Sequence, residues 1–274
     1  MGITGTRDGR LLFVQSDGRV VCVTPSDPQS RPCVVSACAW LPEPRLCSGV
    51  WGETCFVGAA NSFYRVSLAA DEKPRVLFRA KVRDDLVVDP RGGHIVITHQ
   101  VLANEHYDGV LRLRPLASPK PRVVWRASCG AWGSLSRPAY APDGSHIAVG
   151  CSWGHVHLLT NNAQEEEGVG VIRHPEHFHP HIAWSANGRV LAVGAGYELR
   201  IVDVATRSVI RTFDRLHDAI YALAASPDTR RLLVNTHAQP GTRDDARWSA
   251  AIFDFGSPNF GTSAAEHWSD ASFG

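Results

Sequence analysis

Four histidines lie within eight residues in the stretch HPEHFHPH, which runs from His174 to His181. Imidazole nitrogens can transfer protons near neutral pH, and they can bind zinc, iron or manganese. The stretch has neither the helical H-E-x-x-H spacing nor a paired Cys and His spacing. The sequence therefore predicts no metal site and no other cofactor, and a divalent metal held by side chains from several repeats is the alternative.

Other ionisable side chains that could act with these histidines are spread along the chain. The candidates for acid and base roles are His181, His99, His237 and Asp85, and arginines such as Arg137 could orient a substrate. The chain has no G-x-S-x-G nucleophile motif and no glycine-rich phosphate loop. Any active or binding site must therefore be assembled by elements that bring distant residues together.

Those elements are visible as a repeat. Each repeat is a turn of four residues, usually ending in Gly, that is followed by a short apolar strand. The turns start at residues 6, 49, 89, 141, 185 and 226, so they lie 40 to 52 residues apart. A period near 40 predicts four short antiparallel strands per unit, which is the size of a β-propeller blade.

The fifth repeat shows the strands of one unit most clearly. HIAWSANG predicts a strand that enters a tight turn, where Asn187 and Gly188 tolerate a positive φ. RVLAVGAG is the second strand, and YELRIVDVAT is a third strand that alternates with a period of two and ends at Asp203. RSVIRTFDR completes the unit. Such a sheet has two apolar faces and must pack between neighbours.

These residues also carry a family resemblance. SANGRVLAVGAGYELRIVDVATRSVIRTF and HDAIYALAASPDTRRLLVNTH resemble WD-repeat blades, with an S-P-D-G-like turn, L-x-I-x-D where many blades have Trp-Asp, and His217 ahead of the inner strand. The first three repeats match only in the turn and the second strand. None of the six repeats has a full G-H…W-D pair. The resemblance implies a WD-like or TolB-like β-propeller.

We therefore predict an all-β fold in which residues 1–274 form a single β-propeller domain. Six blades of four antiparallel strands are expected, and seven are the alternative if SAAEHWSDASFG begins another unit. Ring closure then has two solutions: MGITGT supplies the first inner strand, or the C-terminal tail pairs with the first blade.

The repeat register gathers charged residues at one end of the inner strands. His181 lies four residues before its turn residue, and the equivalent positions hold Gly2, Arg45, Asp85, Arg137 and Ala222. A charged column at these positions predicts a polar channel mouth that can hold a ligand, while a satisfied ring of salt bridges is the alternative. The predicted binding residues are Arg45, Asp84, Asp85, Arg137, His179, His181, His217 and Trp132.

Two segments between second and third strands are longer than the others. They read THQVLANEHYDG and NTHAQPGTRDDARW, and His99 and His237 lie near their starts. We expect these segments to be long loops on the same face as the channel mouth. The tryptophans, Trp132 and Trp184 among them, are either rim anchors or packing residues between blades.

Composition narrows the classes of partner. Lys plus Arg number 28 and Asp plus Glu number 27, which predicts neither nucleic acid nor membrane as a partner. No apolar run reaches the roughly 20 residues of a membrane span, and the N-terminus does not resemble a signal peptide, so a cytoplasmic protein is expected. The seven cysteines are expected to be buried free thiols.

Three functions fit this sequence. The first is a binding module that presents the rim and central funnel of a propeller to a protein, peptide or small ligand. The second is a small-molecule enzyme of lyase, isomerase, cyclase or hydrolase type, with a site of His, Asp and Arg in the funnel. The third is a propeller sensor domain of a larger signalling protein.

Overall fold

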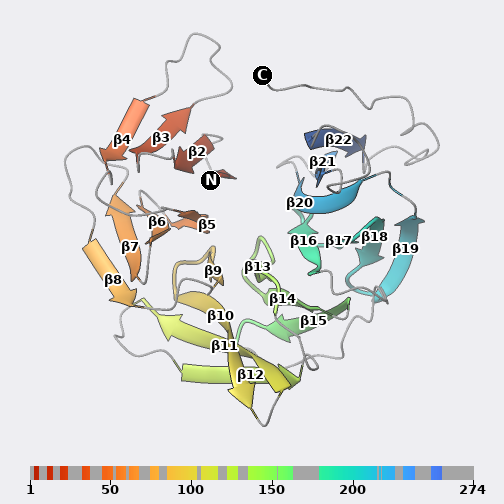
Figure 1. The fold of residues 1–274 in the computed structure, drawn as a ribbon, viewed down its shortest axis with the longest axis horizontal. Coiled ribbons are helices and arrows are strands. Elements are labelled where there is room, and N and C mark those ends of the chain that lie inside the picture. Colours follow the sequence, from red (N-terminus) through yellow and green to blue (C-terminus); the bar gives the residue numbers. More distant parts are fainter. Residues whose placement is uncertain are drawn as a thin grey trace. The chain divides into compact units, whose positions relative to one another are not determined.

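The computed structural model shows strands and turns and no helix in the part of the chain that it describes (Figure 1). This confirms the all-β prediction. The chain forms two compact units: the first comprises Met1–His99 and Arg112–Val123, and the second comprises Gln100–Leu111 and Val124–Gly274. The structure describes residues 3–5, 11–14, 19–23, 33–37, 45–51, 54–59, 62–67, 75–79, 85–103, 106–116, 122–128, 135–152, 154–162, 179–214, 216, 218–225, 231–237 and 248–254.

Sheet 1 has four antiparallel strands in chain order. Its strands are β1 (Ile3–Gly5), β2 (Leu11–Val14), β3 (Arg19–Val23) and β4 (Cys33–Ala37). Strand β1 comes from MGITGT, so the N-terminal segment supplies the first strand of the first sheet, which was one of the two predicted solutions. Leu12, Val20 and Val21 are buried.

Sheets 2 and 3 follow the same antiparallel order and are joined edge to edge. Strands β5 and β9 run parallel and meet at Ser48 and Val87, so the two first strands lie side by side. Sheet 2 consists of β5 (Arg45–Trp51), β6 (Thr54–Ala59), β7 (Ser62–Ser67) and β8 (Arg75–Arg79). Sheet 3 consists of β9 (Asp85–Val88), β10 (His94–Ala103), β11 (His106–Pro115) and β12 (Arg122–Ser128).

A buried cluster holds sheets 2 and 3 together. Phe56 and Phe63 come from sheet 2, and Leu86, Val88, Ile95 and Ile97 come from sheet 3. Each fully buried apolar side chain contributes roughly 2 kcal/mol relative to an exposed one. The buried guanidinium of Arg114 adds a polar link, because its Nη2 donates a hydrogen bond of 3.0 Å to the carbonyl of Leu77. Burial lowers the pKa of Arg114.

The segment THQVLANEHYDG differs from its prediction as a long loop. It continues the strands of sheet 3, so that β10 and β11 each have ten residues and only 104–105 stand between them. The prediction was wrong because it relied on apolar periodicity, and these residues extend the strands without such a pattern. They are Gln100 to Ala103 in β10 and His106 to Asp108 in β11. His99 therefore lies inside strand β10.

The second unit contains three further sheets, each with antiparallel strands in chain order. Sheet 4 consists of β13 (Ala139–Tyr140), β14 (His146–Cys151) and β15 (His155–Thr160). Sheet 5 consists of β16 (His181–Trp184), β17 (Val190–Ala195), β18 (Glu198–Asp203) and β19 (Ser208–Phe213). Sheet 6 consists of β20 (Ala219–Ala225), β21 (Arg231–His237) and β22 (Trp248–Asp254).

The repeated turns form as predicted where the structure describes them. Gly92, Gly144 and Gly188 have φ values of 78°, 67° and 70°, which glycine adopts without the steric cost of a Cβ atom. In the fifth repeat, the Asn187 side chain accepts hydrogen bonds from the hydroxyl of Ser185 and the backbone N–H of Arg189. These bonds fix the hairpin between β16 and β17.

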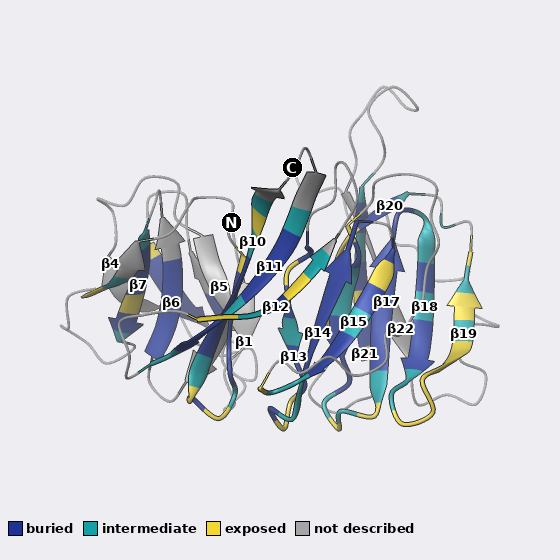
Figure 2. Cartoon of the chain, turned by 90° about the horizontal axis from the view of Figure 1, so that it is seen from below, coloured by how far each residue is buried: buried dark blue, intermediate teal, exposed yellow. Residues whose placement is uncertain are grey.

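Apolar clusters between consecutive sheets form the core of the second unit. One cluster joins sheets 4 and 5 and includes Val156, Leu158, Leu191 and Val193. Another joins sheets 5 and 6 and includes Leu199, Ile201, Leu232 and Val234. Figure 2 shows the inner strands β14, β17 and β18 as largely buried and the outermost strand β19 as exposed. Each sheet thus buries a face against its neighbour, as the blade prediction requires.

Trp184 is one of these packing residues. Its side chain is buried, and its indole Nε1 donates a hydrogen bond of 3.0 Å to the carbonyl of Ala139 in sheet 4. The packing alternative is therefore confirmed for this tryptophan. Of the seven cysteines, Cys22, Cys55 and Cys151 are buried thiols outside any disulfide, as expected. Among the described residues, none belongs to a helix that is long and apolar enough to cross a membrane.

Candidate functional site

Several predicted site residues lie outside the described residues. These are Asp84, Trp132 and His217. His174 and His177 of the histidine stretch, which are not predicted site residues, also lie outside the described residues. Arg45 begins strand β5, but its side chain is outside the described part of the structure. Their roles stay predictions.

In the first unit, Asp85 and His99 lie at neighbouring ladder positions of sheet 3. Asp85 is the exposed first residue of β9 and pairs with the buried Thr98 of β10. His99 follows Thr98 directly and is half-buried. The carboxylate and the imidazole therefore come from adjacent strands at the same end of the sheet.

His237 lies at the end of a strand rather than at the start of a loop. It is the last residue of β21 and pairs with Ala219 and Trp248. Its ring meets the edge of the exposed Tyr221 ring, with centroids 5.5 Å apart. Tyr221 is the extra residue of a β-bulge in β20, which turns its side chain from the regular alternation. Residues 238–247, which the sequence predicts to be a long loop, lie outside the described residues.

Arg137 occupies an irregular position that the repeat register did not predict. Leu135 bridges Cys151, and Ala139 pairs with Ala148, so four steps on this strand match three steps on β14. The register therefore shifts by one residue at Arg137 and Pro138, where the proline cannot donate a ladder hydrogen bond. Arg137 precedes β13 instead of lying within it, and its side chain is exposed.

Gly150 fixes the segments that carry Arg137 and His181. Its N–H donates to the hydroxyl of Ser136, and its carbonyl accepts from the N–H of Ser136. A Cβ atom added at Gly150 would lie 2.7 Å from Ser136 Oγ and 2.8 Å from Pro180 Cγ. The neighbours of Arg137 and His181 therefore both contact the same glycine of β14.

We call Arg137, His179 and His181 the entry patch. Strands β13 and β16, which these residues precede or begin, contact each other. His179 is exposed, Pro180 is buried, and His181 is half-buried at the first ladder position of β16, opposite Gly194. The patch thus combines an exposed guanidinium with two imidazoles from two segments that both approach Gly150.

The environment of His181 keeps its imidazole neutral. Burial, and secondly the charge of His179, lower the pKa of His181 to about 4. A general base works best when its pKa lies near the working pH, so His181 is a weak base for chemistry at pH 7. A neutral imidazole can still donate one hydrogen bond and accept another.

The predicted site residues that the structure describes thus fall into two groups, one in each unit. Asp85 and His99 lie in the first unit, while the entry patch and His237 lie in the second. Sequence reasoning missed the residues that hold the entry patch, which are Ser136, Gly150 and Pro180. The run from Ser136 to Pro138, which faces Gly150 of the next strand, is a signal that could have identified Ser136 and Gly150 but not Pro180.

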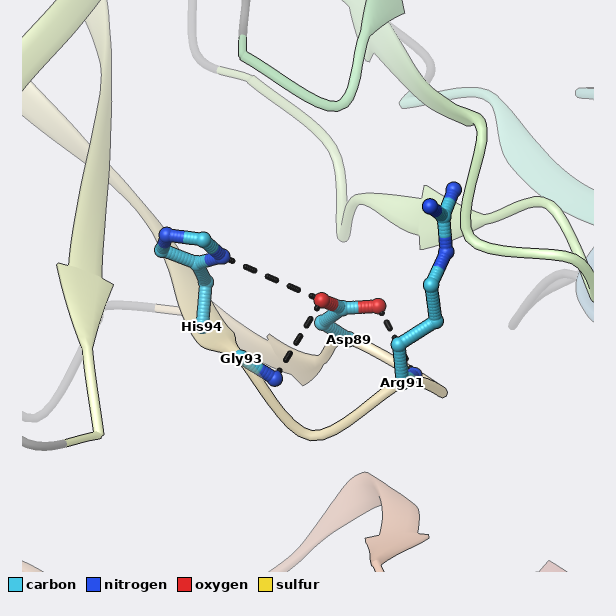
Figure 3. A network of polar contacts seen from close by, with 4 residues as sticks. All are labelled: Asp89, Arg91, Gly93 and His94. Atoms are coloured by element: carbon cyan, nitrogen blue, oxygen red, sulfur yellow. Dashed lines mark hydrogen bonds and ion pairs between the residues drawn. The ribbon is translucent and has the colours of Figure 1, made fainter.

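Sequence reasoning also missed the role of Asp89, which begins the third turn. Its carboxylate accepts hydrogen bonds from the backbone N–H groups of Arg91 and Gly93, at 2.9 Å and 3.3 Å (Figure 3). His94 Nδ1 lies 3.8 Å from Asp89 Oδ2. Asp89 is buried, so these contacts compensate the desolvation of its carboxylate and brace the turn between β9 and β10.

Asp203 has a comparable role in sheet 5. Its Oδ1 accepts hydrogen bonds from the N–H and the hydroxyl of Thr206, at 2.8 Å and 2.9 Å. These bonds lower the pKa of Asp203. The aspartate of the L-x-I-x-D motif therefore braces the turn between β18 and β19.

The described residues contain no group of three or more His, Cys, Asp and Glu side chains that is arranged to hold a metal ion. The hydroxyl of Ser145 does connect Asp143 and His146, at 2.6 Å and 2.7 Å. In this cluster the serine lies between the acid and the imidazole. This order differs from a catalytic triad, in which the histidine stands between the serine and the acid.

No protein-family model matches the chain, and no curated protein matches it in sequence. Solved structures resemble its fold. The β-propeller domain of Cps50 (Swd1) from Myceliophteria thermophila has a TM-score of 0.59 at 13% identity, covering 86% of this chain and 79% of that one. A chain of the mitotic checkpoint complex has a TM-score of 0.61 at 12% identity, covering 92% and 74%.

A third similar structure is an enzyme, the hydrazine synthase of Kuenenia stuttgartiensis. It has a TM-score of 0.57 at 15% identity, covering 85% of this chain and 79% of that one. Identities this low show the fold and carry no information about the reaction. The antiparallel sheets, the apolar clusters between consecutive sheets and these likenesses together show that the chain has the fold of a β-propeller.

Proposed function

We propose that this chain is a protein-interaction module and that its partner docks on the entry patch. The observation that carries the proposal is the position of Arg137. Its charged side chain is exposed at a register shift between two strands, while Ser136 and Pro138 on either side of it are buried. Buried neighbours hold the backbone at Arg137 in place. A residue whose backbone is already fixed loses less conformational entropy when it binds a partner, which suits an anchoring residue of a binding site.

The chemistry of the patch favours an acidic group on the partner. An arginine can bind a carboxylate with two parallel N–H donors, which gives both strength and orientation. The neutral imidazole of His181 can add one hydrogen bond, and His179 is exposed beside it. An aspartate, a glutamate or a C-terminal carboxylate on the partner would complement the charge and the donors of this patch.

The similar structures support an interaction role in general. One is a propeller domain, and another is part of a multiprotein assembly, the mitotic checkpoint complex. A rigid propeller can present a fixed set of side chains without moving, which suits a docking surface.

The experiment is quantitative affinity capture with the immobilised chain, comparing the unchanged protein with Arg137→Glu and Arg137→Lys. Arg189→Glu is the matched control, because Arg189 is also exposed but lies in the β16–β17 turn. We expect Arg137→Glu to remove specific partners, Arg137→Lys to retain part of their binding, and the control to retain all of it. Equal capture by all four proteins, each confirmed to be folded, would contradict the proposal.

A further inference from the structure

Strand β11 of sheet 3 carries two arginines on one face. Arg112 and Arg114 stand two residues apart in this strand, so their side chains leave the sheet on the same side. The hydrogen bond from Arg114 Nη2 to the carbonyl of Leu77 in β8 shows that this side faces sheet 2. Both arginines and sheet 2 belong to the first unit. The two guanidiniums therefore extend toward the interface between sheets 2 and 3.

Both side chains are withdrawn from water, and one of them has an unsatisfied donor. Arg114 is 6% exposed, and Arg112 is half-buried. The Nε of Arg112 is buried and has no hydrogen-bond partner among the described residues. A buried donor of a charged group is costly to leave without an acceptor, so such a donor in a folded protein indicates that another species supplies the acceptor.

The facing sheet offers these arginines no carboxylate. Strands β5 to β8 of sheet 2 contain no aspartate or glutamate, and their charged residues are Arg45, Arg65, Arg75 and Arg79. The buried cluster between sheets 2 and 3 is entirely apolar. The strands of sheet 2 therefore add positive charge, and they do not neutralise Arg112 and Arg114.

The acidic residues of sheet 3 are placed elsewhere. Asp85 lies on the opposite face of β9, because its neighbour Leu86 belongs to the cluster that faces sheet 2. The carboxylate of Asp89 already accepts hydrogen bonds from two backbone N–H groups of its own turn. Asp108 stands four residues before Arg112 in β11, which is roughly 13 Å along an extended strand. In the described strands, the two positive charges thus have no acidic side chain close to them in sequence or on the facing sheet.

We propose that Arg112 and Arg114 form an anion site that binds the phosphate group of a small molecule. A phosphate ester carries roughly two negative charges at pH 7, which matches two guanidiniums better than the single charge of a carboxylate does. Arginine binds phosphate through paired N–H donors, and the Nε of Arg112 is such a donor.

The two arginines have different roles in this site. Arg112, the more exposed of the two, contacts the phosphate, and the charge of Arg114 on the same face strengthens the attraction. Because Arg114 is almost fully buried, the site suits a small ligand and not the surface of a macromolecule. The site belongs to the first unit, whereas the entry patch belongs to the second.

The test is the protection of Arg112 from phenylglyoxal, which modifies accessible arginines, in the unchanged chain. The probes are inorganic phosphate and glycerol 3-phosphate, and acetate at the same ionic strength is the control. Mass spectrometry follows the modification of Arg112 and of Arg189, an exposed arginine of the second unit. Calorimetry measures the binding of phosphate to the unchanged protein, to Arg112→Gln and to Arg137→Gln.

At about ten times its Kd, phosphate should slow the modification of Arg112 about tenfold, because only protein without bound phosphate reacts there. Modification of Arg189 should not change. Whichever of the two phosphate probes protects at the lower concentration identifies the source of the phosphate, a free ion or an ester.

Arg112→Gln should weaken phosphate binding about tenfold or more, and Arg137→Gln should leave it unchanged. Four results would overturn the proposal. They are no protection of Arg112 by either phosphate probe, equal protection by acetate, equal slowing at Arg189, and loss of phosphate binding in Arg137→Gln instead of Arg112→Gln. If Arg112→Gln does not fold, the protection experiment on the unchanged chain still decides.

Discussion

At the residue scale, His181 links the entry patch to the stability of the fold. The folded protein holds the pKa of His181 at about 4, whereas an unfolded histidine titrates near 6.5. Between these pH values the unfolded chain binds a proton that the folded chain does not. The contribution of His181 is therefore fully present above about pH 6.5 and is lost as the pH falls toward 4.

The test is urea unfolding of the unchanged protein and of His181→Gln, which cannot titrate, between pH 7.5 and 4.5. We expect the unchanged protein to lose about 2 kcal/mol more of its free energy of unfolding than the variant over this range, a value reduced for the partial exposure of His181. Parallel pH profiles of the two proteins would show that His181 is not held neutral by the fold.

Asp89 gives a second prediction at this scale. Asp89→Ala removes the acceptor of the Arg91 and Gly93 N–H groups in a buried turn, so it should lower the free energy of unfolding by about 1 to 3 kcal/mol. Asp89→Asn keeps one acceptor oxygen and should cost less. Chemical denaturation measures both. An equal loss in the two variants would mean that these hydrogen bonds are not what braces the turn.

At the element scale, Gly150 of β14 positions both segments of the entry patch. Gly150→Ala would place a methyl group against Ser136 and Pro180, so the neighbouring segments must shift. We expect a loss of about 1 to 3 kcal/mol in stability and weaker partner binding. The matched control is Gly188→Ala, where a Cβ atom meets nothing closer than 3.8 Å but the φ of 70° is strained.

Both glycine variants should thus be destabilised, but only Gly150→Ala should change partner binding. Binding is measured by the same affinity capture, at a temperature where both variants are folded, as shown by circular dichroism. A loss of binding in Gly188→Ala that equals the loss in Gly150→Ala would show that general stability, and not local positioning, controls the entry patch.

The elements also show how far the sequence could be interpreted. The turns at Gly144 and Gly188 and the four strands of sheet 5 were predicted because turn chemistry and alternation are local. The length of β10 and β11, the bulge at Tyr221 and the register shift at Arg137 depend on how many ladder bonds the neighbouring strands offer. The number of ladder bonds that a neighbouring strand offers is not a local property of the sequence. The repeat register, which placed Arg137 and Ala222 at equivalent strand positions, therefore did not predict these three features.

At the scale of the whole molecule, buried faces between consecutive sheets explain why the repeat predicts the fold. Leu191 packs toward sheet 4 and Ile201 toward sheet 6, so sheet 5 contributes to two apolar clusters at once. Period and turn chemistry were sufficient to predict a propeller. They did not predict the function, because the entry patch depends on single residues, such as Gly150, that the repeat does not distinguish.

The most direct test of an interaction module that uses the entry patch is site-specific photocrosslinking in cells. In one variant, benzoylphenylalanine replaces His179, while Arg137 and His181 stay unchanged. In the control variant, it replaces the exposed Ala205. We predict a discrete protein adduct from position 179 that falls about tenfold when Arg137→Glu is added, and no such adduct from position 205. An adduct that does not depend on Arg137, equal adducts from both positions, or no protein adduct from position 179 would contradict it.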